Sequence, residues 1–481
     1  MDLIIFGAVA LLAAFALILG AAFVLHLGHK HEQGLLPYIF YPVLLSIGIG
    51  ALLSGRNLFF FDEMMLAAPA SKHAAVAWAS RVATLMLLLV PFERIGHHLL
   101  AGRRRPAVPM ALLFGFLAFF VTNIVTSAFL SAHHSLVKDY FMFAGAGVAA
   151  LLMSRSEAES ALRVFRNGVL VFMLIGAMVA PVRPELVMSH NYFGILPGVH
   201  IRYAGLSSHA NSLGPLSVTF LLCLWRSPYA NRLLSWFAWG LGLATLLLTQ
   251  SKSSYISFLL GMACLMYFQG EQSLVRRLLD HRRPHLPVAL ILGALGVLAV
   301  VCLAFMFGGM GDRITRFFGS SAGAELVSLT GRDEVWRIAL QEWRRSPVFG
   351  YGLTIFDDAY RYQIRIPYAY HAHSQFYQSL ASAGLVGFFG LIVYLATLLW
   401  FAVRTVRASE GLSLALFLML LSRSVSEVPM SLIGFGTEQM MQLLLLMVLA
   451  GYMRRPAAAA AAGTPAVVVP AQNLAYARGV R

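Results

Sequence analysis

Thirteen apolar runs alternate with short polar stretches along the chain. Most approach the roughly 20 residues that a helix needs to cross the hydrocarbon core of a membrane. Lipid offers no hydrogen-bond partners, so such runs must form helices or a closed barrel, and the alternating strands of about ten residues that are typical of a barrel are absent. The pattern predicts membrane spans at residues 3–25, 36–54, 76–97, 107–131, 138–154, 166–183, 212–226, 233–250, 254–269, 286–308, 375–402, 411–422 and 437–453.

This pattern predicts an all-α, polytopic integral membrane protein with about 12 (12–13) transmembrane helices and one large loop that contains short helices. Residues 1–308 are expected to form transmembrane helices 1–10 with short loops, and residues 309–374 the large loop. Residues 375–453 should form the C-terminal transmembrane helices, and residues 454–481 a disordered cytoplasmic tail of low complexity. Near the N-terminus two arrangements stay open: a translocated N-terminus with 13 spans, or 12 spans with residues 55–74 partly re-entrant.

The composition agrees with this class, because 59% of the 481 residues are hydrophobic and only 12% are charged. The formal net charge of +15 would suit a nucleic-acid partner if the basic residues formed one surface. Instead they form short clusters between the apolar runs, which is typical of cytoplasmic loops, so no nucleic acid is expected. The clusters lie at residues 102–106, 154–166, 226–232, 276–285, 404–407 and 453–455.

Placing these clusters in the cytoplasm puts five other segments outside, at residues 132–137, 184–211, 250–254, 309–374 and 423–436. Four of the five carry an unusual share of cations and imidazoles. These segments supply the candidate site residues His200, Arg202, His209, Asn211, Lys252, Arg332, Arg361, Arg365, His371, His373, Arg423 and Glu427.

Taken singly, each candidate has an ordinary explanation: arginine and lysine at helix ends extend to lipid headgroups, and a histidine at a helix start often caps the helix. Taken together, they predict a positive pocket just outside the bilayer. Guanidinium and ammonium groups bind pyrophosphate oxygens and stabilise them as a leaving group, and a neutral histidine can accept the proton of an attacking hydroxyl. The sequence contains no ATP-binding loop, so the expected donor is an activated lipid diphosphate.

No metal and no cofactor are expected. His371 and His373 are two residues apart, and in a helix this spacing points the side chains away from each other. No cysteine or carboxylate cluster accompanies them in the sequence. The three cysteines lie inside apolar runs, where they are typical of small buried hydrophobic residues.

Within the large loop, a short amphipathic helix is predicted after Thr330 and Asp333, whose spacing resembles a capping box. Pro347 ends it. We expect the apolar face of this helix, with its two tryptophans, to lie on the membrane surface. That face comprises Val335, Trp336, Ala339, Leu340 and Trp343.

Four motifs in order along the chain resemble those of the O-antigen ligase family. His373-Ser374, nine further residues and Gly384-Leu-Val-Gly387 resemble the signature H-[NSQ]-x9-G-x-x-[GTY]. Upstream, "TGRDEVWRIALQEWRRSPVFGYG" is similar to the segment G-R-x-x-x-W…P-x-x-G-x-G. "RYAGLSSHANSLG" is similar to R-x-x-G…N-x-x-G, and "TQSKSSYIS" to T-x-S-R, with Lys252 in place of the usual arginine. The resemblance spans roughly residues 195–400.

This resemblance implies an inverting, metal-independent glycosyltransferase in the inner membrane of a Gram-negative cell, with its active site facing the periplasm. The implied donor is polysaccharide on undecaprenyl diphosphate, and the implied acceptor is a sugar hydroxyl of lipid A–core. His373 would be the catalytic base or position the acceptor. Arg332 would be the second catalytic residue and bind the diphosphate together with Lys252.

Further substrate-binding residues follow from the resemblance and the topology. Arg202 falls on the family's loop arginine, and His371 is expected to be secondary to His373. Arg423 is added because the topology places it at the next external helix mouth. The full substrate-binding set is Arg202, Lys252, Arg423, His371, Asn211 and Arg365.

Other functions stay open. O-antigen polymerases and protein O-oligosaccharyltransferases belong to the same superfamily and use the same donor with a different acceptor. A lipid-linked glycan transporter is a further alternative, although the ionisable residues predicted inside a span are few: Arg81, Glu93 and Arg94. A structural scaffold would tolerate loss of His373 and of Arg332. The oligomeric state is not predicted.

Overall fold

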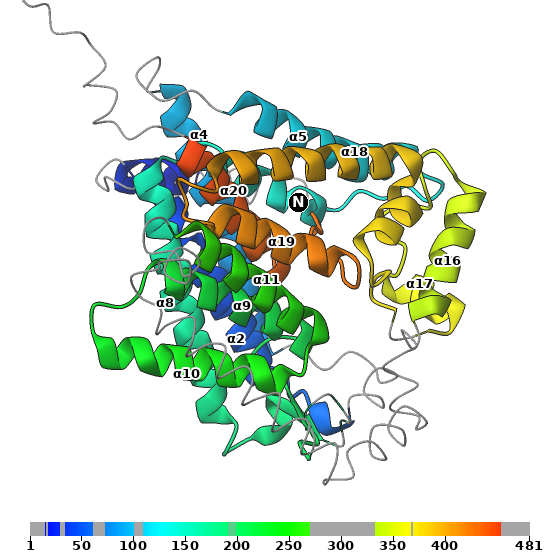
Figure 1. Ribbon diagram of the computed structural model, residues 1–481. Helices are drawn as coiled ribbons and strands as arrows, with labels where there is room; N and C mark the ends of the chain where they lie inside the picture. The colour runs from blue at the N-terminus through cyan, green and yellow to red at the C-terminus, as the bar shows by residue number, and fades with distance from the viewer. Residues whose placement is uncertain are drawn as a thin grey trace, which may run out of the picture.

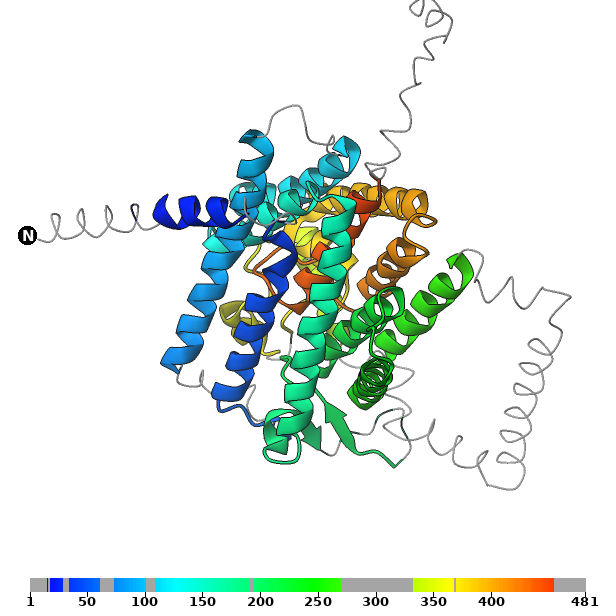
Figure 2. The ribbon, with the colours of Figure 1, turned by 90° about the vertical axis from the view of Figure 1, so that its left-hand side faces the viewer.

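The computed structural model describes residues 15, 18–28, 34–60, 73–100, 109–190, 192, 194, 196, 198–269, 332–366 and 369–453. The chain is mostly helical, and Figures 1 and 2 show its long helices packed into one bundle, with α16 and α17 at one side of it. The elements are η1 (Leu36–Ile39), α2 (Phe40–Leu53), η2 (Leu58–Phe60), α4 (Ala74–Leu100), α5 (Met110–Phe120), η4 (Val121–Val125), α6 (Thr126–Leu130), η5 (Lys138–Tyr140), α7 (Met142–Ala150), α8 (Arg155–Val179), η6 (Pro184–Leu186), β1 (Met188–His190), β2 (Ile201–Tyr203), α9 (Ala210–Arg226), α10 (Arg232–Thr249), α11 (Lys252–Phe268), α16 (Arg332–Arg345), α17 (Asp358–Ile364), α18 (Gln375–Thr405), α19 (Leu412–Ser424) and α20 (Thr437–Met453).

Helix α20 forms the centre of the bundle, because nearly every one of its side chains is buried. Helices α7, α8, α9, α18 and α19 pack around it. A helix that is apolar on all faces belongs inside a protein or a membrane. On the other side of α8, helices α2 and α4 lie side by side, as Figure 2 shows.

Among the described residues, six helices are long and apolar enough to cross a membrane. They are Leu36–Leu53, Ala74–Leu100, Met110–Leu130, Arg155–Val179, Arg232–Thr249 and Gln375–Thr405. The prediction of a polytopic helical membrane protein is therefore supported, and the total of about 12 spans stays a prediction. The predicted span 286–308 and the predicted tail 454–481 lie outside the described residues.

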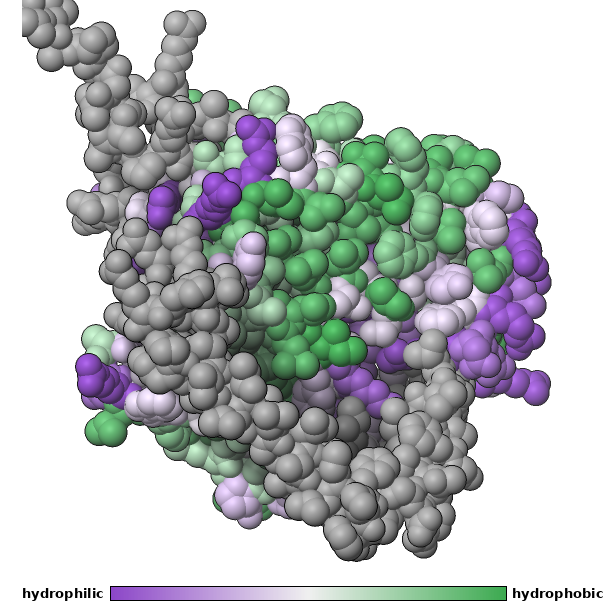
Figure 3. Space-filling view, viewed as in Figure 1, coloured by the Kyte–Doolittle hydropathy of each residue, from purple (hydrophilic) through white to green (hydrophobic). Residues whose placement is uncertain are grey.

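The outer surface of α18 is suited to lipid. It exposes large apolar side chains, among them Leu385, Phe389 and Trp400, and Figure 3 shows apolar surface over the middle of this face. Polar side chains gather instead over α16 at one end. An apolar band of this kind is typical of a surface that contacts a bilayer or a partner.

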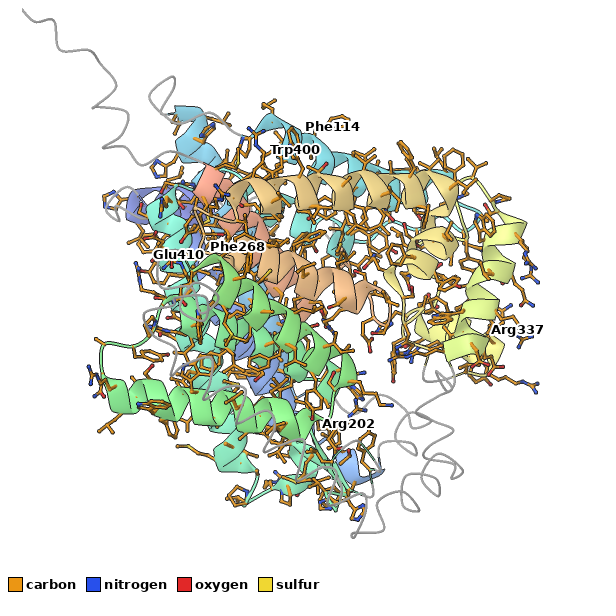
Figure 4. The ribbon with its side chains drawn as sticks, viewed as in Figure 1. Phe114, Arg202, Phe268, Arg337, Trp400 and Glu410 are labelled. Carbon is orange, nitrogen blue, oxygen red and sulfur yellow. The ribbon has the colours of Figure 1, made fainter. Side chains whose placement is uncertain are left out.

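The two ends of the bundle are distinct. At one end, Arg226 lies 3.5 Å from Glu410 and the Arg155 guanidinium stacks 4.9 Å from the ring centroid of Tyr452. These residues come from the clusters predicted to be cytoplasmic or from their neighbourhood. Figure 4 shows Glu410 on the opposite side of the molecule from Arg202 and Arg337. Which side of a membrane each end faces stays a prediction.

Helix α8 begins earlier than predicted. The sequence placed residues 154–166 in a loop before a span at 166–183, but the helix starts at Arg155. Ser154 and Glu157 form a reciprocal capping box there, which fixes the start. Arg166 sits within the helix because its guanidinium lies over the Tyr229 ring, 3.7 Å from the centroid. The predicted boundary is wrong because these basic residues have partners in the bundle.

Helix α18 bends at Gly384, which has a positive φ of 64° inside the helix. The bend leaves backbone groups of α18 without partners inside the helix, and residues 347–352 form hydrogen bonds with them. Leu385 N donates to Pro347 O over 2.8 Å, and Tyr351 N donates to Ala381 O over 2.8 Å. A Cβ at position 384 would lie 2.4 Å from the Val348 backbone, so only glycine fits. The bend ties the first turns of α18 to the segment that follows α16.

Helix α16 packs on protein, contrary to the expectation that its apolar face lies on the membrane. Val335 and Ala339 are buried in a small core with Ile355, Phe356 and other residues. Trp336 stacks on Tyr377 at 5.0 Å between ring centroids and donates from Nε1 to Ala372 O. The prediction is wrong for this face because the loop after α16 folds back and covers it. Thr330 lies outside the described residues.

Candidate active site

The first part of the site is carried by the segment between α8 and α9. Strands β1 and β2 pair antiparallel with Ser189 opposite Arg202, a small sheet that the sequence did not predict. Arg56, at the end of α2, donates to the carbonyl oxygens of Leu186, Gly205 and Ser207 over 2.6–2.7 Å. These bonds hold the segment against the bundle. Arg202 is thereby fixed at the cavity wall.

The start of α9 adds a histidine and an asparagine. His209 caps the helix, and its Nδ1 accepts from Asn211 N over 3.0 Å. The Asn211 side chain accepts from Arg202 Nη2 over 2.6 Å and donates to Glu427 Oε1 over 2.9 Å. Asn211 therefore connects the Arg202 cation to a carboxylate that is 216 residues away in the sequence.

The turn before α18 supplies the two remaining histidines. His373 has a φ of 47°, which is uncommon for a residue with a side chain and turns the backbone sharply. Its N–H donates to His371 Nδ1 over 3.1 Å, and the two rings lie 4.3 Å apart. The residues precede the helix, so the helical spacing assumed from the sequence does not apply. Both side chains face the same region.

Glu427, in the segment after α19, is the centre of the site. Its Oε1 accepts from Asn211 and lies 3.2 Å from Arg332 Nη2. Its Oε2 lies 3.4 Å from His373 Nδ1 and 3.7 Å from His371 Nε2. Glu427 is only 6% exposed, so these four residues surround a buried carboxylate. Buried charges are retained only where partners of this kind compensate their desolvation.

A cavity of about 1700 Å³ opens beside this carboxylate. Its wall combines residues from the external segments with the first turns of α18 and part of η4. Eight of the twelve candidate residues line it: Arg202, His209, Asn211, Arg332, His371, His373, Arg423 and Glu427. A cavity of this size with convergent polar groups is the usual form of a binding site.

Four candidates do not line the cavity: His200, Lys252, Arg361 and Arg365. Lys252 is exposed at the start of α11, and Arg365 is exposed at the C-terminal end of α17 with a positive φ of 57°. Neither lines the cavity in the part of the chain described. The expectation for Lys252 came from the resemblance to T-x-S-R and that for Arg365 from its place in the large loop, and neither fixes the direction of a side chain.

Arg423 lines the cavity but is bound within the protein. It is 1% exposed, forms a bidentate ion pair with Glu438 and donates to Asn211 O over 3.0 Å. Its guanidinium therefore anchors α20 and the start of α9 to α19. This arrangement favours a positioning role over direct contact with a substrate.

The electrostatics of the site keep Glu427 ionised. Burial alone would raise the pKa of this carboxyl, but the close contact with His373 and the charges of His371, His373 and Arg423 outweigh it and lower the pKa to about 2. Desolvation lowers the pKa of His371 to about 4, and the neighbouring His373 charge acts in the same direction. Desolvation and Arg202 likewise lower the pKa of His209 to about 4. His209 and His371 are therefore neutral at pH 7.

The hydrogen bonds also fix the tautomers. A backbone N–H always donates, so Nδ1 of His371 and Nδ1 of His209 are acceptors, and in the neutral rings Nε2 carries the proton. The Nε2–H of His371 then faces Glu427 Oε2. His373 presents Nδ1 to the same oxygen, and if Nδ1 carries the ring proton, Nε2 is free to act as a base.

The same geometry bears on metal binding. The ligand atoms of His371, His373 and Glu427 lie within 4.8 Å of one another, so a single carboxylate lies with the two histidines, a contact that the sequence did not predict. The carboxylate comes from a distant segment. A neutral His371 that bound a metal through Nε2 would need its proton on Nδ1, where it already accepts from His373 N. Arg332 beside Glu427 further disfavours a cation. These residues do not fit a resident metal.

Sequence reasoning named Glu427 and gave it no role. The signal was present, since a glutamate at a predicted external helix mouth lies among cations, but its partners come from three separate segments. Glu438, the partner of Arg423, was not considered at all because it lies at the start of an apolar run.

Comparison with known families adds to this geometry. Residues 237–392 match the family model described as O-Antigen ligase. This part of the chain is similar to an O-antigen ligase domain. The match covers α18 up to Ile392 and so includes Arg332, His371, His373 and the glycine bend, while Arg202 and Glu427 lie outside it. No curated protein matches the chain. The family supports a glycosyltransferase-like enzyme acting on lipid-linked polysaccharide.

The structure also explains two O-antigen ligase motifs. The glycines at 384 and 350 are required where α18 bends against the segment after α16, because a Cβ at either position would lie within 2.7 Å of backbone atoms. Gly387 and Gly390 pack against Asn123 and Thr122 of η4. The signature therefore combines a histidine at the cavity with glycines that hold its helix in place.

Proposed function

We propose that the protein is an O-antigen ligase in the inner membrane of a Gram-negative cell, with its active site facing the periplasm. It transfers polysaccharide from undecaprenyl diphosphate to a sugar hydroxyl of lipid A–core. The observation that carries this proposal is the contact of His373 with the buried Glu427 carboxylate at the wall of a large cavity, which Arg202 and Arg332 also line. The matched family supplies the substrate class.

In this mechanism Arg332 and Arg202 bind the donor diphosphate. Arg332 donates from one nitrogen to Glu427. Arg202 donates from Nε to Thr249 O and from Nη2 to the Asn211 side chain. A guanidinium has five N–H donors, so both side chains keep donors for phosphate oxygens. Desolvation lowers the pKa of Arg202. A buried cation of this kind is stabilised by an incoming anion.

His373 then acts as the general base. Its Nδ1 faces the Glu427 carboxylate, which favours the protonated ring that forms when Nε2 takes the proton of the acceptor hydroxyl. The hydroxyl oxygen attacks the anomeric carbon from the face opposite the diphosphate. A new C–O bond forms, the bond to the diphosphate breaks, and its electron pair leaves with the diphosphate, whose charge the arginines stabilise. The anomeric configuration is inverted, and no metal takes part.

Reconstitution of the purified full chain tests this proposal. Proteoliposomes containing lipid-linked polysaccharide are incubated with lipid A–core or without an acceptor. Conjugate that forms only with lipid A–core supports the ligase. Lengthened lipid-linked glycan in the absence of lipid A–core would instead identify a polymerase, and transfer only to an added serine- and threonine-containing protein would identify an O-oligosaccharyltransferase. Product with a retained anomeric configuration would contradict the single displacement.

A further inference from the structure

The cavity has a second wall that differs from the charged one. The first turns of α18 place Gln375, Gln378, Ser379 and Ser382 on the cavity lining. Their spacing of 3, 4 and 7 residues puts them on one face of the helix, over a length of about 10 Å at 1.5 Å per residue. We call these four residues the amide–hydroxyl stripe. It begins two residues after His373 and contains no charged side chain.

The two glutamines present donors to the cavity. Met430 N donates to Gln375 Oε1 over 2.9 Å, and Ala372 N donates to Gln378 Oε1 over 2.8 Å. Because a backbone N–H can only donate, these bonds identify the side-chain oxygens and leave the NH₂ groups for other partners. Within the described residues, neither NH₂ group has an acceptor. Gln375 is 3% exposed and lines the cavity, so a ligand in the cavity can supply an acceptor for its NH₂ group.

The two serines present acceptors. Ser379 Oγ donates its proton to Asn123 Oδ1 over 2.6 Å, and Ser382 Oγ donates to Gln378 O over 2.7 Å. Their oxygens keep lone pairs free to accept. Asn123 lies in the π-helical turn η4, where its Nδ2 donates to Gly387 O over 2.9 Å. Asn123 therefore holds the Ser379 hydroxyl in this orientation.

We infer that the amide–hydroxyl stripe binds the sugar ring that carries the attacking hydroxyl. A sugar hydroxyl both donates and accepts, so a row of uncharged donors and acceptors matches it, whereas a diphosphate requires the cations that line the cavity elsewhere. The stripe adjoins His373, and the acceptor hydroxyl must lie within hydrogen-bond reach of that base. This inference rests on the proposed function and adds the acceptor subsite to it.

Kinetics with two substrates tests the inference in the full-length protein. Gln378→Glu keeps the side-chain size and the acceptor for Ala372 N but removes the NH₂ donors. Ser382→Ala provides a second variant at the other end of the stripe, and Gln341→Leu, at an exposed position on α16, is the matched control. Lipid A–core is titrated at fixed lipid-linked donor, and the donor is then titrated at fixed lipid A–core.

We expect Gln378→Glu to raise KM for lipid A–core about tenfold, the loss of roughly one hydrogen bond, with KM for the donor within twofold of wild type. Ser382→Ala should raise the same KM about threefold, and Gln341→Leu should change neither. A rise in the donor KM alone, or no change in either KM for both stripe variants, would overturn the inference. If wild type forms no conjugate in this assay, the proposed function fails instead, so the two failures are distinguishable.

Discussion

Two buried ionic clusters in this molecule use the same residue types and differ in what surrounds them. In the first, the Glu157 carboxylate accepts from Arg94 and from Ser154 N, and Arg94 also donates to Leu152 O. In the second, Glu427 contacts Arg332, Asn211, His371 and His373 at the wall of the cavity. None of Arg94, Glu93 and Glu157 lines that cavity.

The comparison shows that burial and charge alone do not identify a functional site. The Arg94–Glu157 pair holds α4 against the start of α8. Its other partners are backbone groups of the protein, which no ligand can replace. Glu93 accepts from Leu35 N and lies 3.6 Å from His97. These contacts account for Glu93 and Arg94, two of the three ionisable residues that could have suggested a transport path. The Glu427 cluster faces a cavity that a ligand can enter, so a bound ligand can replace some of the contacts within the cluster.

The largest expected effect concerns the first cluster. Glu157→Gln leaves Arg94 buried without its counter-charge, which should lower the free energy of unfolding by about 3–5 kcal/mol. Activity per folded molecule should stay within twofold of wild type. Thermal unfolding in detergent, combined with turnover corrected for the folded fraction, measures both. Glu159→Gln is the matched control, because Glu159 is half-exposed and pairs with Arg155 at the surface, where an ion pair contributes under about 1 kcal/mol.

The second cluster should behave in the opposite way. Glu427→Gln removes the charge that favours a protonated His373, and kcat should fall about 100-fold, or about 2.7 kcal/mol in activation free energy. Stability should change less than in Glu157→Gln, because glutamine keeps an acceptor for Asn211 and Arg332. Single-turnover transfer with bound donor measures the chemical step. The distinction between the clusters would be contradicted if Glu427→Gln lowered the free energy of unfolding as much as Glu157→Gln does and left the transfer rate unchanged.

Proton linkage gives a smaller effect. The pKa of His209 is about 4 in the folded protein and near 6.5 in an unfolded chain, so the unfolded state binds more protons between these values. Stability therefore falls as the pH drops, by the order of 1–2 kcal/mol between pH 6.5 and 5. His209→Asn keeps a side-chain cap for α9 and should abolish this part of the pH dependence. Unfolding midpoints at the two pH values check it, and parallel slopes in wild type and variant would contradict it.

The smallest effect is expected at Arg365. This residue is exposed, caps α17 and does not line the cavity, so Arg365→Ala should leave the turnover within twofold of wild type. Arg332→Ala, in the same assay, should reduce it at least 100-fold because it removes a diphosphate contact. A loss at Arg365 comparable to that at Arg332 would mean that the substrate extends beyond the cavity.

The sequence predicted the helices well because lipid solvation imposes a simple rule on span length. The boundaries of α10, α18 and α20 agree with the predicted spans to within a few residues. The early start of α8 was missed, since Arg166 depends on Tyr229, a contact between segments. Topology likewise placed Arg202, Arg332 and His373 on one side, where the structure brings them together.

What the sequence could not predict is which charges pair. Glu427 meets Arg332, Asn211 and His373 across separations of 54 to 216 residues, and no local pattern encodes such contacts. Arg423 was predicted to bind substrate, yet its pairing with Glu438 depends on how α19 packs on α20. The turn at His373 was read as helix, although its positive φ brings both imidazoles to one carboxylate.

The most direct test of the account is His373→Ala, examined for donor binding and for transfer in the same reconstituted preparation. We expect the variant to bind undecaprenyl-diphosphate-linked polysaccharide with an affinity within about threefold of wild type, since the arginines remain, and to form conjugate with lipid A–core at least 100-fold more slowly. Transfer at the wild-type rate would contradict the assignment of His373 as the base and, with it, the active site described above.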